Sequence, residues 1–414
     1  DFYLPDLKAT ALIVQSEIDS PAKAVAQRRG IPVIELTPML EAEAGIFTLT
    51  AYKGSRPIRE GFAEAEDVAL VLHTSGTTSR PKMVPLTQKN LLASANHIGT
   101  TLELTEKDRC LNIMPLFHIH ALVGAVLASL MAGASVVCTS GFDAEEFFTW
   151  LGESHPTWYT AVPTIHQAAL SCAAAHKEQL QRCSLRFIRS SSAALPPQVM
   201  QGLEEVFQVP VIEAYGMTEA SHQISSNPLP PRPRRPGSVG ISAGPEVAIM
   251  DEAGKLLSSG KAGEIVIRGA NVMSAYANGS EANRESFTRG WFRTGDEGYL
   301  DADGYLFITG RLKEIINRGG EKISPREVDE VLMQHPAVSQ AVTFAVPHST
   351  LGEDVAAAVV QRAKMSVTEG KIQRFAAMRL AEFKIPRQVL IVQEIPKSAT
   401  GKVERIGLAE ELGL

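Results

Sequence analysis

The stretch His73-Thr74-Ser75-Gly76-Thr77-Thr78-Ser79-Arg80-Pro81-Lys82-Met83 carries the strongest signal in the chain, and it directly follows the apolar run at residues 68–72. The run predicts a strand, and the hydroxyls, glycine and cation after it can surround a polyphosphate, because they supply hydrogen-bond donors and positive charge. We therefore predict a phosphate-binding loop, with an ordinary surface turn as the alternative. The loop is not of the Walker A type, since Pro81 precedes Lys82 and no Ser or Thr follows it.

Length and composition describe an ordinary globular protein. The chain has 414 residues, of which 44% are hydrophobic and 21% are charged, so we expect two or three domains. Its net charge of −6 gives no support to binding of nucleic acid. The sequence starts at Asp1 without a signal-like segment, which makes the cytoplasm the expected location. Four cysteines lack the spacing of a zinc or redox site, and we expect reduced thiols at Cys110, Cys138, Cys172 and Cys183.

Residues 120–138 contain no charged side chain and approach the length of a membrane-spanning helix. Gly124, Gly133 and Ser135 interrupt the stretch, and its Ala/Leu-rich part gives way to the β-branched Val136 and Val137. We therefore predict a buried helix that leads into a buried strand, and no membrane span.

The apolar pattern predicts an α/β protein in which a large N-terminal domain of layered sheets and helices precedes a small α+β domain. Short runs at 68–72, 136–138 and 185–188 alternate with helical spacing at 161–175 and 197–206, as in largely parallel sheets. The runs at 264–268 and 304–308 are typical of antiparallel strands. After Gly310 the sequence predicts helices at 325–333 and 368–383 and strands at 338–346 and 355–360.

Five further motifs follow the phosphate loop along the chain. They are Tyr159-Thr160-Ala161-Val162-Pro163-Thr164, Glu213-Ala214-Tyr215-Gly216-Met217-Thr218-Glu219, Thr294-Gly295-Asp296, Gly310-Arg311-Leu312-Lys313-Glu314 and Lys397-Ser398-Ala399-Thr400-Gly401-Lys402. From about residue 1 to 412 this series resembles the adenylate-forming superfamily of acyl-CoA synthetases, adenylation domains and luciferases. Segments 74–82, 158–167 and 316–325 look most like the oxalate-CoA ligase branch.

The resemblance implies the adenylate-forming fold, with a large AMP-binding domain at 1–310, a hinge at 311–313 and a small domain at 314–414. It also implies a two-step reaction in which a carboxylate attacks the α-phosphate of ATP and coenzyme A then displaces AMP from the acyl-adenylate. Because two anions must meet in the first step, cations and Mg²⁺ are needed around the phosphate. The substrates and partners implied are therefore a small carboxylic acid, ATP and coenzyme A.

Carried over residue by residue, the resemblance assigns most of the nucleotide site. It implies that the β- and γ-phosphates are held by Thr74, Ser75, Gly76, Thr77, Thr78 and Lys82. Tyr215 stacks on adenine, and Ala193, Ala194, Glu213, Ala214 and Gly216 lie beside the nucleotide. Asp296 accepts from the two ribose hydroxyls with support from Arg311. Thr218 contacts the α-phosphate, and Glu219 is the Mg²⁺ ligand.

The resemblance also assigns catalysis and domain movement. Lys402 reaches between the acyl carboxylate and the α-phosphate, where its charge offsets their repulsion. The small domain rotates about Lys313, which withdraws Lys402 and brings Gly319 and Gly320 to the channel for coenzyme A. Judged by composition alone, Lys402 is a solvated residue in a terminal tail.

The acid-binding residues are expected at His118, Ser190, Ser192 and His222. His118 resembles the gate beside the acyl group, although a histidine in an apolar segment is more often a core residue. On an extended segment Ser190 and Ser192 share one face. Hydroxyls and an imidazole suit a small polar acid such as oxalate, because an apolar tail leaves each of them unpaired at a cost of about 1 to 3 kcal/mol.

Three departures from the family pattern stand out. Met83 replaces a glycine of the phosphate loop, which raises a question about rate, and Ala121 replaces a glycine after the histidines. Relatives also begin with a segment before Asp1, so we expect an N-terminally shortened chain.

Two alternative functions remain beside a free-standing CoA ligase. One is a module that loads an acyl group onto a phosphopantetheine carrier domain. The other is a non-catalytic nucleotide-binding module, which the presence of Lys82, Glu219, Asp296 and Lys402 disfavours.

Overall fold

The computed structural model describes residues 2–50, 61–74, 81–362, 364–397 and 403–414, and it divides into two units, residues 1–62 and 63–414. In the first unit, β1 (Leu12–Gln15) pairs in parallel with β2 (Val33–Pro38), and β3 (Phe47–Leu49) adds antiparallel to β2. The helices are α1 (Tyr3–Asp6) and α2 (Pro21–Arg28). Ser20 caps α2 because its hydroxyl accepts from the N–H of Ala22.

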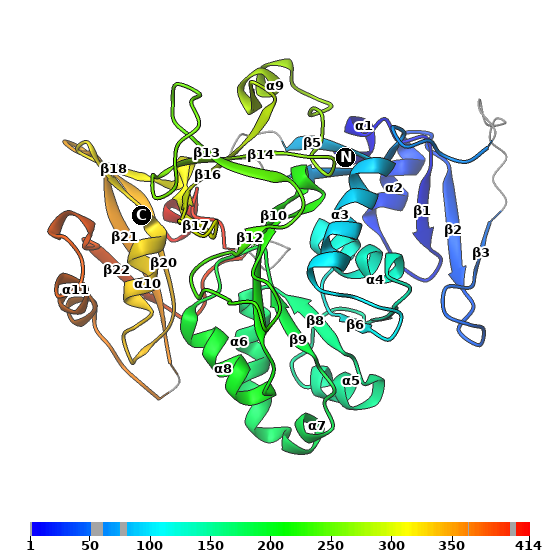
Figure 1. Cartoon of the computed structure of the whole chain (residues 1–414), viewed down its shortest axis with the longest axis horizontal. Coiled ribbons are helices and arrows are strands. Elements are labelled where there is room, and N and C mark those ends of the chain that lie inside the picture. The colour runs from blue at the N-terminus through cyan, green and yellow to red at the C-terminus, as the bar shows by residue number, and fades with distance from the viewer. Residues whose placement is uncertain (1, 51–60, 75–80, 363, 398–402) are drawn as a thin grey trace. The chain divides into compact units, whose positions relative to one another are not determined.

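A seven-stranded sheet forms the centre of the second unit (Figure 1), with the order β12-β11-β10-β9-β8-β6-β7. Its strands are β6 (Arg109–Asn112), β7 (Ser135–Cys138), β8 (Trp158–Ala161), β9 (Phe187–Ser190), β10 (Val211–Met217), β11 (His222–Ser226) and β12 (Ile241–Ser242). From β7 to β10 the pairing is parallel, as predicted, whereas β11 and β12 add antiparallel.

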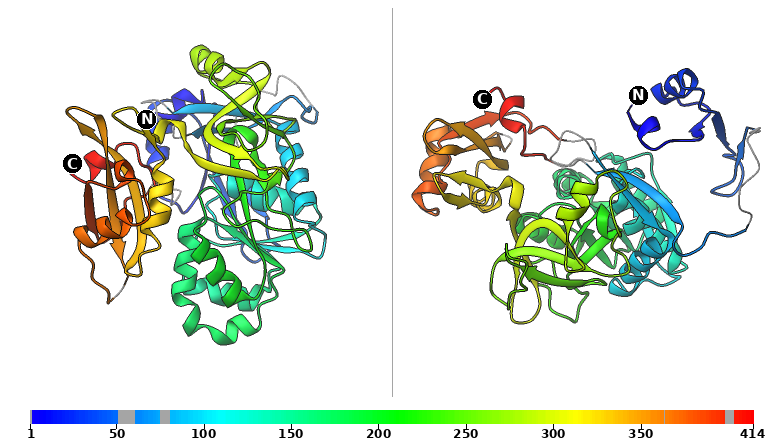
Figure 2. Two further views of the ribbon diagram at one scale, coloured as in Figure 1. Left: turned by 60° about the vertical axis from the view of Figure 1, so that its left-hand side comes forward. Right: turned by 90° about the horizontal axis from the view of Figure 1, so that it is seen from above.

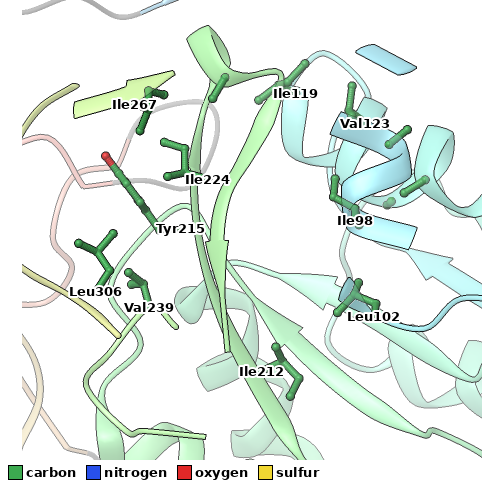
Figure 3. Packing of buried hydrophobic residues seen from close by; sticks show 14 of the residues in the cluster. Ile98, Leu102, Ile119, Val123, Ile212, Tyr215, Ile224, Val239, Ile267 and Leu306 are labelled. Carbon is green, nitrogen blue, oxygen red and sulfur yellow. The ribbon is translucent and has the colours of Figure 1, made fainter. Parts of the chain in front are cut away.

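Helices cover both faces of this sheet because alternate strand residues point to opposite sides. Trp158 and Phe187 face α3 (Gln88–Thr101) and the π-helix η1 (His120–Leu127), while Tyr159 and Ile188 belong to the opposite cluster. That second cluster is covered by α5 (Glu146–Ser154), α6 (Pro163–Cys172) and α8 (Pro197–Phe207). The short helices η2 (Ala173–Ala175) and α7 (Lys177–Gln181) follow α6. Figure 3 shows Ile98, Ile119 and Val123 on one side of β10 and Tyr215 on the other.

The uncharged stretch at 120–138 forms η1, α4 (Ala128–Met131) and β7. The predicted change from helix to strand is confirmed, but the expectation of a buried strand was wrong, because β7 lies at the edge of the sheet and Cys138 is exposed. Within the described ranges, no helix is both long and apolar enough to cross a membrane.

A five-stranded antiparallel sheet confirms the antiparallel strands predicted at 264–268 and 304–308. It consists of β13 (Glu246–Met250), β14 (Gly263–Arg268), β15 (Phe287–Thr288), β16 (Trp291–Leu300) and β17 (Leu306–Arg311), with α9 (Ser280–Ser286) before β15. The predicted strand at 68–72 extends to Thr74. It forms β4 (Val68–Thr74), which pairs antiparallel with β5 (Lys82–Thr87).

The C-terminal part folds as an α+β unit, as predicted (Figure 2). Its strands are β18 (Ile316–Arg318), β19 (Glu321–Ile323), β20 (Val338–His348), β21 (Gly352–Gln361) and β22 (Gln388–Val392). Its helices are α10 (Pro325–Leu332), α11 (Glu369–Ala377), η5 (Glu382–Lys384) and α12 (Leu408–Glu411). The helix expected at 368–383 ends earlier, at Ala377. The 3₁₀ turn η4 (Leu312–Glu314) separates β17 from β18, and the domain boundary at 311–313 stays a prediction.

Candidate active site

A cavity of about 310 Å³ opens at the C-terminal ends of β9 and β10, where ligands of parallel sheets commonly bind. It brings together eight of the residues expected at the site: Ser192, Ala193, Ala194, Ala214, Tyr215, Gly216, Asp296 and Arg311. Glu314, Asp329, Val403 and Arg405 line it from the C-terminal part of the chain. The cavity therefore joins segments that lie far apart in the sequence.

Both carboxylate oxygens of Asp296, which lines this cavity, accept hydrogen bonds. Its Oδ2 accepts from the Tyr215 hydroxyl at 2.5 Å, and its Oδ1 accepts from Nε of Arg311 at 2.8 Å. The carboxylate raises the pKa of the Arg311 guanidinium, and burial together with Asp296 raises the pKa of Tyr215 well above its usual value. The two hydrogen bonds hold the Asp296 carboxylate in one orientation, with one oxygen toward Tyr215 and the other toward Arg311.

Glu213 lies behind the cavity wall rather than in its lining. Its Oε1 accepts from the backbone N–H of Leu195 at 3.0 Å, which connects β10 to the loop that carries Ala193 and Ala194. Burial raises the pKa of Glu213 to about 7. Glu213 therefore holds in place the loop that lines the cavity with Ala193 and Ala194.

Lys82 and Glu219 both contact Tyr276, a residue that the sequence analysis did not single out. The Tyr276 hydroxyl donates to Oε1 of Glu219 at 2.8 Å, and Nζ of Lys82 lies 4.5 Å from the centre of the Tyr276 ring. Burial raises the pKa of Glu219, while burial and the neighbouring Lys313 lower that of Lys82. Thr74 pairs with Lys82 across β4 and β5, whereas the predicted phosphate ligands Ser75, Gly76, Thr77 and Thr78 lie outside the described residues.

Met83 lies in β5, just after the predicted phosphate loop, and hydrogen bonds hold its backbone on both sides. Its N–H donates to Oδ1 of Asn278 at 2.8 Å, its carbonyl accepts from the N–H of Ala277 at 3.0 Å, and its side chain is buried. The methionine that replaces the family's glycine therefore fits here, with its side chain packed in the interior.

Buried polar side chains gather beside Ser192. The Ser192 hydroxyl lies 3.0 Å from Nδ1 of His120, whose Nε2 lies 2.6 Å from the Thr160 hydroxyl. The His120 ring stacks on His222 with a centroid separation of 4.8 Å and an interplanar angle of 18°. The sequence prediction named His118 but missed His120. His118 instead uses Nδ1 to accept from the backbone N–H of His120 at 3.1 Å.

Arg189 completes this cluster and was also missed. It is fully buried, and its Nη1 lies 2.9 Å from Nε2 of His222. A single arginine inside an apolar strand matches no sequence motif. Its contact with His222, which begins β11, appears only in the folded structure. Backbone strain gathers here too, since the non-glycine residues Ser192, Ser221 and His222 have φ values of 71°, 50° and 97°.

The predicted common face of Ser190 and Ser192 was wrong. Alternation along β9 places Ser190 on the face of Ile188, opposite Arg189, and the left-handed backbone of Ser192 ends the extended segment that the prediction assumed. The Ser190 hydroxyl is buried and has no hydrogen-bond partner among the described residues.

The remaining predicted residues lie outside the cavity lining. Thr218 begins the turn η3 (Thr218–Ala220), and Lys313 lies in η4. Gly319 and Gly320 form the turn between β18 and β19 with φ values of 61° and 98°, a conformation that favours glycine. Lys402 lies outside the described residues, and Val403, the next residue, lines the cavity.

Comparisons with known proteins agree with this geometry. The sequence profile of the AMP-binding enzyme family matches residues 1–277, and that of the AMP-binding enzyme C-terminal domain matches residues 327–402. An oxalate–CoA ligase of Arabidopsis thaliana is 47% identical over 98% of this chain and 79% of its own length. One from Saccharomyces cerevisiae is 45% identical over 87% of this chain and 66% of its own length. The ATP-bound structure of MatB from Rhodopseudomonas palustris superposes with a TM-score of 0.86 at 28% identity, covering 99% of this chain and 80% of that one.

The layered fold and the pocket around Tyr215, Asp296 and Arg311 define an adenylate-forming enzyme. The chain belongs to the AMP-binding enzyme family. It is an AMP-forming acyl-CoA synthetase, an acid–thiol ligase that uses ATP, Mg²⁺ and coenzyme A. A carrier domain as acceptor is not favoured, because the matching relatives are CoA ligases.

Proposed function

We propose that this enzyme activates oxalate or a similarly short dicarboxylate and transfers it to coenzyme A. The observation that carries the proposal is a polar cluster in which the buried His120, His222 and Arg189 lie behind the half-buried Ser192. An apolar acyl chain offers no partner to any polar group of this cluster that faces the substrate, at a cost of about 1 to 3 kcal/mol for each group left unpaired, whereas carboxylate oxygens accept from several donors at once. Two of the most similar relatives are oxalate–CoA ligases, which supports the same substrate class.

The nucleotide then occupies the cavity with its adenine against Tyr215 and its ribose at Asp296. Both carboxylate oxygens of Asp296 already accept one hydrogen bond, from Tyr215 and Arg311, and each retains capacity for another. Two ribose hydroxyls can therefore bind without displacing either partner. Ala193, Ala194, Ala214 and Gly216 present small side chains that leave room for the base.

Glu219 is the proposed ligand of Mg²⁺. It is a single buried carboxylate oriented by Tyr276, and Mg²⁺ in nucleotide sites is commonly held by one or two carboxylates together with the phosphates. The ion supplies charge that stabilises the phosphate in the transition state. Lys82 adds a second positive charge, and Thr218 precedes Glu219 at the position proposed to contact the α-phosphate.

Lys402 is the proposed catalytic lysine of the first step. Arg405 supports this, because it forms ion pairs with Asp329 and Glu314 and so holds the segment after Lys402 at the cavity. For the second step we propose rotation about Lys313, which brings Gly319 and Gly320 to the thiol channel. His118 is the proposed gate, Ser190 stays a candidate acid-site residue, and a cytoplasmic location stays a prediction.

A panel of acids tests the substrate. Pyrophosphate release is measured with oxalate, malonate and hexanoate, each with ATP and Mg²⁺, and product is then measured with coenzyme A and with a carrier protein. We expect release with oxalate or malonate and thioester formation with coenzyme A. Turnover of hexanoate without turnover of either dicarboxylate contradicts the proposal.

A further inference from the structure

Arg189 is a buried cation without an acidic partner. Among the described residues no carboxylate contacts it, and its guanidinium instead donates to Nε2 of His222 at 2.9 Å and to Oε1 of Gln223 at 3.2 Å. Burial of a charge without a counter-ion costs stability. The position therefore calls for a functional explanation.

The hydrogen bond to His222 determines where the imidazole carries its proton. A guanidinium has donors and no acceptor, so Nε2 of His222 must accept with its lone pair and the ring proton must lie on Nδ1. Burial lowers the pKa of Arg189 to about 10, which leaves it charged at neutral pH. Burial, Arg189, His120 and His118 together hold the pKa of His222 well below its usual value, so the ring is neutral.

We propose that Arg189 is a positioning residue that fixes His222 as the neutral Nδ1–H tautomer, so that the ring presents a permanent hydrogen-bond donor to the acid substrate. No hydrogen bond to Nδ1 is found within the described part of the chain. The contact between His222 and the acid substrate rests on the function proposed above. The tautomer of His222 does not depend on that function.

The surroundings of His222 fix the ring in place. It stacks on His120, which contacts the cavity-lining Ser192. A Cβ atom on Gly124 would lie 2.7 Å from Cδ2 and Nε2 of the ring, so glycine is required there for close packing. The strained φ of 97° at His222 is typical of a functional position.

Nitrogen-15 NMR of the histidine-labelled full chain reads the tautomer directly, without substrate. A His222→Gln variant assigns the signals. We expect wild-type His222 to show a protonated Nδ1 and an unprotonated Nε2, and Arg189→Gln to lose this fixed pattern, since an amide can donate or accept. A protonated Nε2 in the wild type overturns the inference, whatever the substrate proves to be.

Steady-state kinetics tests the consequence for the acid. In Arg189→Gln we expect the KM for oxalate to rise about tenfold, with the KM for ATP unchanged, and kcat/KM to become pH-dependent near neutrality. Arg189→Lys, which keeps a donor-only group, should restore part of the lost affinity. The matched control is Arg186→Gln. Arg186 directly precedes β9 and forms an ion pair with Asp108, away from the histidine cluster.

An equal rise of both KM values in Arg189→Gln overturns the inference. A wild type inactive on oxalate but showing the expected tautomer contradicts only the substrate proposal.

Discussion

Asp296 shows how position alters the role of a common residue. An aspartate after a glycine is most often a turn former. Here β16 and β17 place Asp296 opposite Arg311, and β10 brings the Tyr215 hydroxyl to its second oxygen. Both contacts fix the orientation of the carboxylate in advance, which reduces the ordering that binding of the proposed nucleotide requires.

Glu213 gives a stability prediction at the scale of one residue. Burial raises its pKa to about 7, so the folded protein binds this proton more tightly than the unfolded chain does. The wild type therefore loses stability as the pH rises from about 4.5 through about 7. Glu213→Gln cannot ionise but keeps an acceptor for Leu195. We expect it to be more stable than the wild type at pH 8 by at most about 3 kcal/mol.

Chemical unfolding at pH 5 and at pH 8 measures this difference. Glu205→Gln, on the exposed side of α8, controls for the change of charge. If Glu213→Gln and the wild type lose stability equally between the two pH values, the buried acid is not the cause.

At the scale of elements, Gly216 lets β10 and β11 approach each other. The register shifts between Tyr215 and Gly216, and a Cβ atom on Gly216 would lie 1.5 Å from the carbonyl oxygen of His222. Gly216→Ala must push the two strands apart. We expect a loss of about 3 kcal/mol or more in stability, and higher KM values for both ATP and the acid, since Tyr215 and His222 move together.

Thermal unfolding and the two KM values test this. The matched control is Gly99→Ala in α3, where an added Cβ meets nothing within 4 Å. We expect Gly99→Ala to stabilise slightly, because alanine favours a helix over glycine by about 1 kcal/mol. A Gly216→Ala variant as stable as Gly99→Ala disproves the close approach.

Sequence patterns predicted most elements because periodicity is a local property. Periodicity predicted the parallel strands, the antiparallel strands after residue 260 and the C-terminal α+β unit. The edge position of β7 and the antiparallel addition of β11 did not, since strand order depends on packing partners far along the chain. The shared face of Ser190 and Ser192 failed for the same reason, because Ser192 adopts its left-handed backbone in the folded chain.

At the scale of the whole molecule, Lys402 links the terminal segment to the first half-reaction. We predict that Lys402→Ala nearly abolishes adenylate formation yet leaves thioester formation from a supplied acyl-adenylate largely intact, because only the first step brings two anions together. Pyrophosphate exchange and single-turnover thioester assays separate the steps. Lys397→Ala, on the same segment, is the control. Equal loss in both half-reactions refutes this role.

The proposed rotation about Lys313 gives a second prediction at this scale. Lys313→Pro restricts the backbone of η4. We expect a folded enzyme that still releases pyrophosphate but makes little thioester, whereas Lys313→Ala, which keeps backbone freedom, should retain both steps. Circular dichroism checks the fold, and paired half-reaction assays check the coupling. Unchanged thioester synthesis in the proline variant counts against a hinge here.

The sequence by itself was enough to predict the enzyme class, because the hydroxyl-rich segment at 74–82 and the motifs after it are each short runs of neighbouring residues. Only the tertiary structure decided the contacts that make those residues work. The hydrogen-bonded partners are far apart in the sequence: 81 residues separate Tyr215 from Asp296, 57 separate Glu219 from Tyr276, and 33 separate His222 from Arg189. Such pairs leave no local pattern, because strand order and side-chain packing bring them together after the chain has folded.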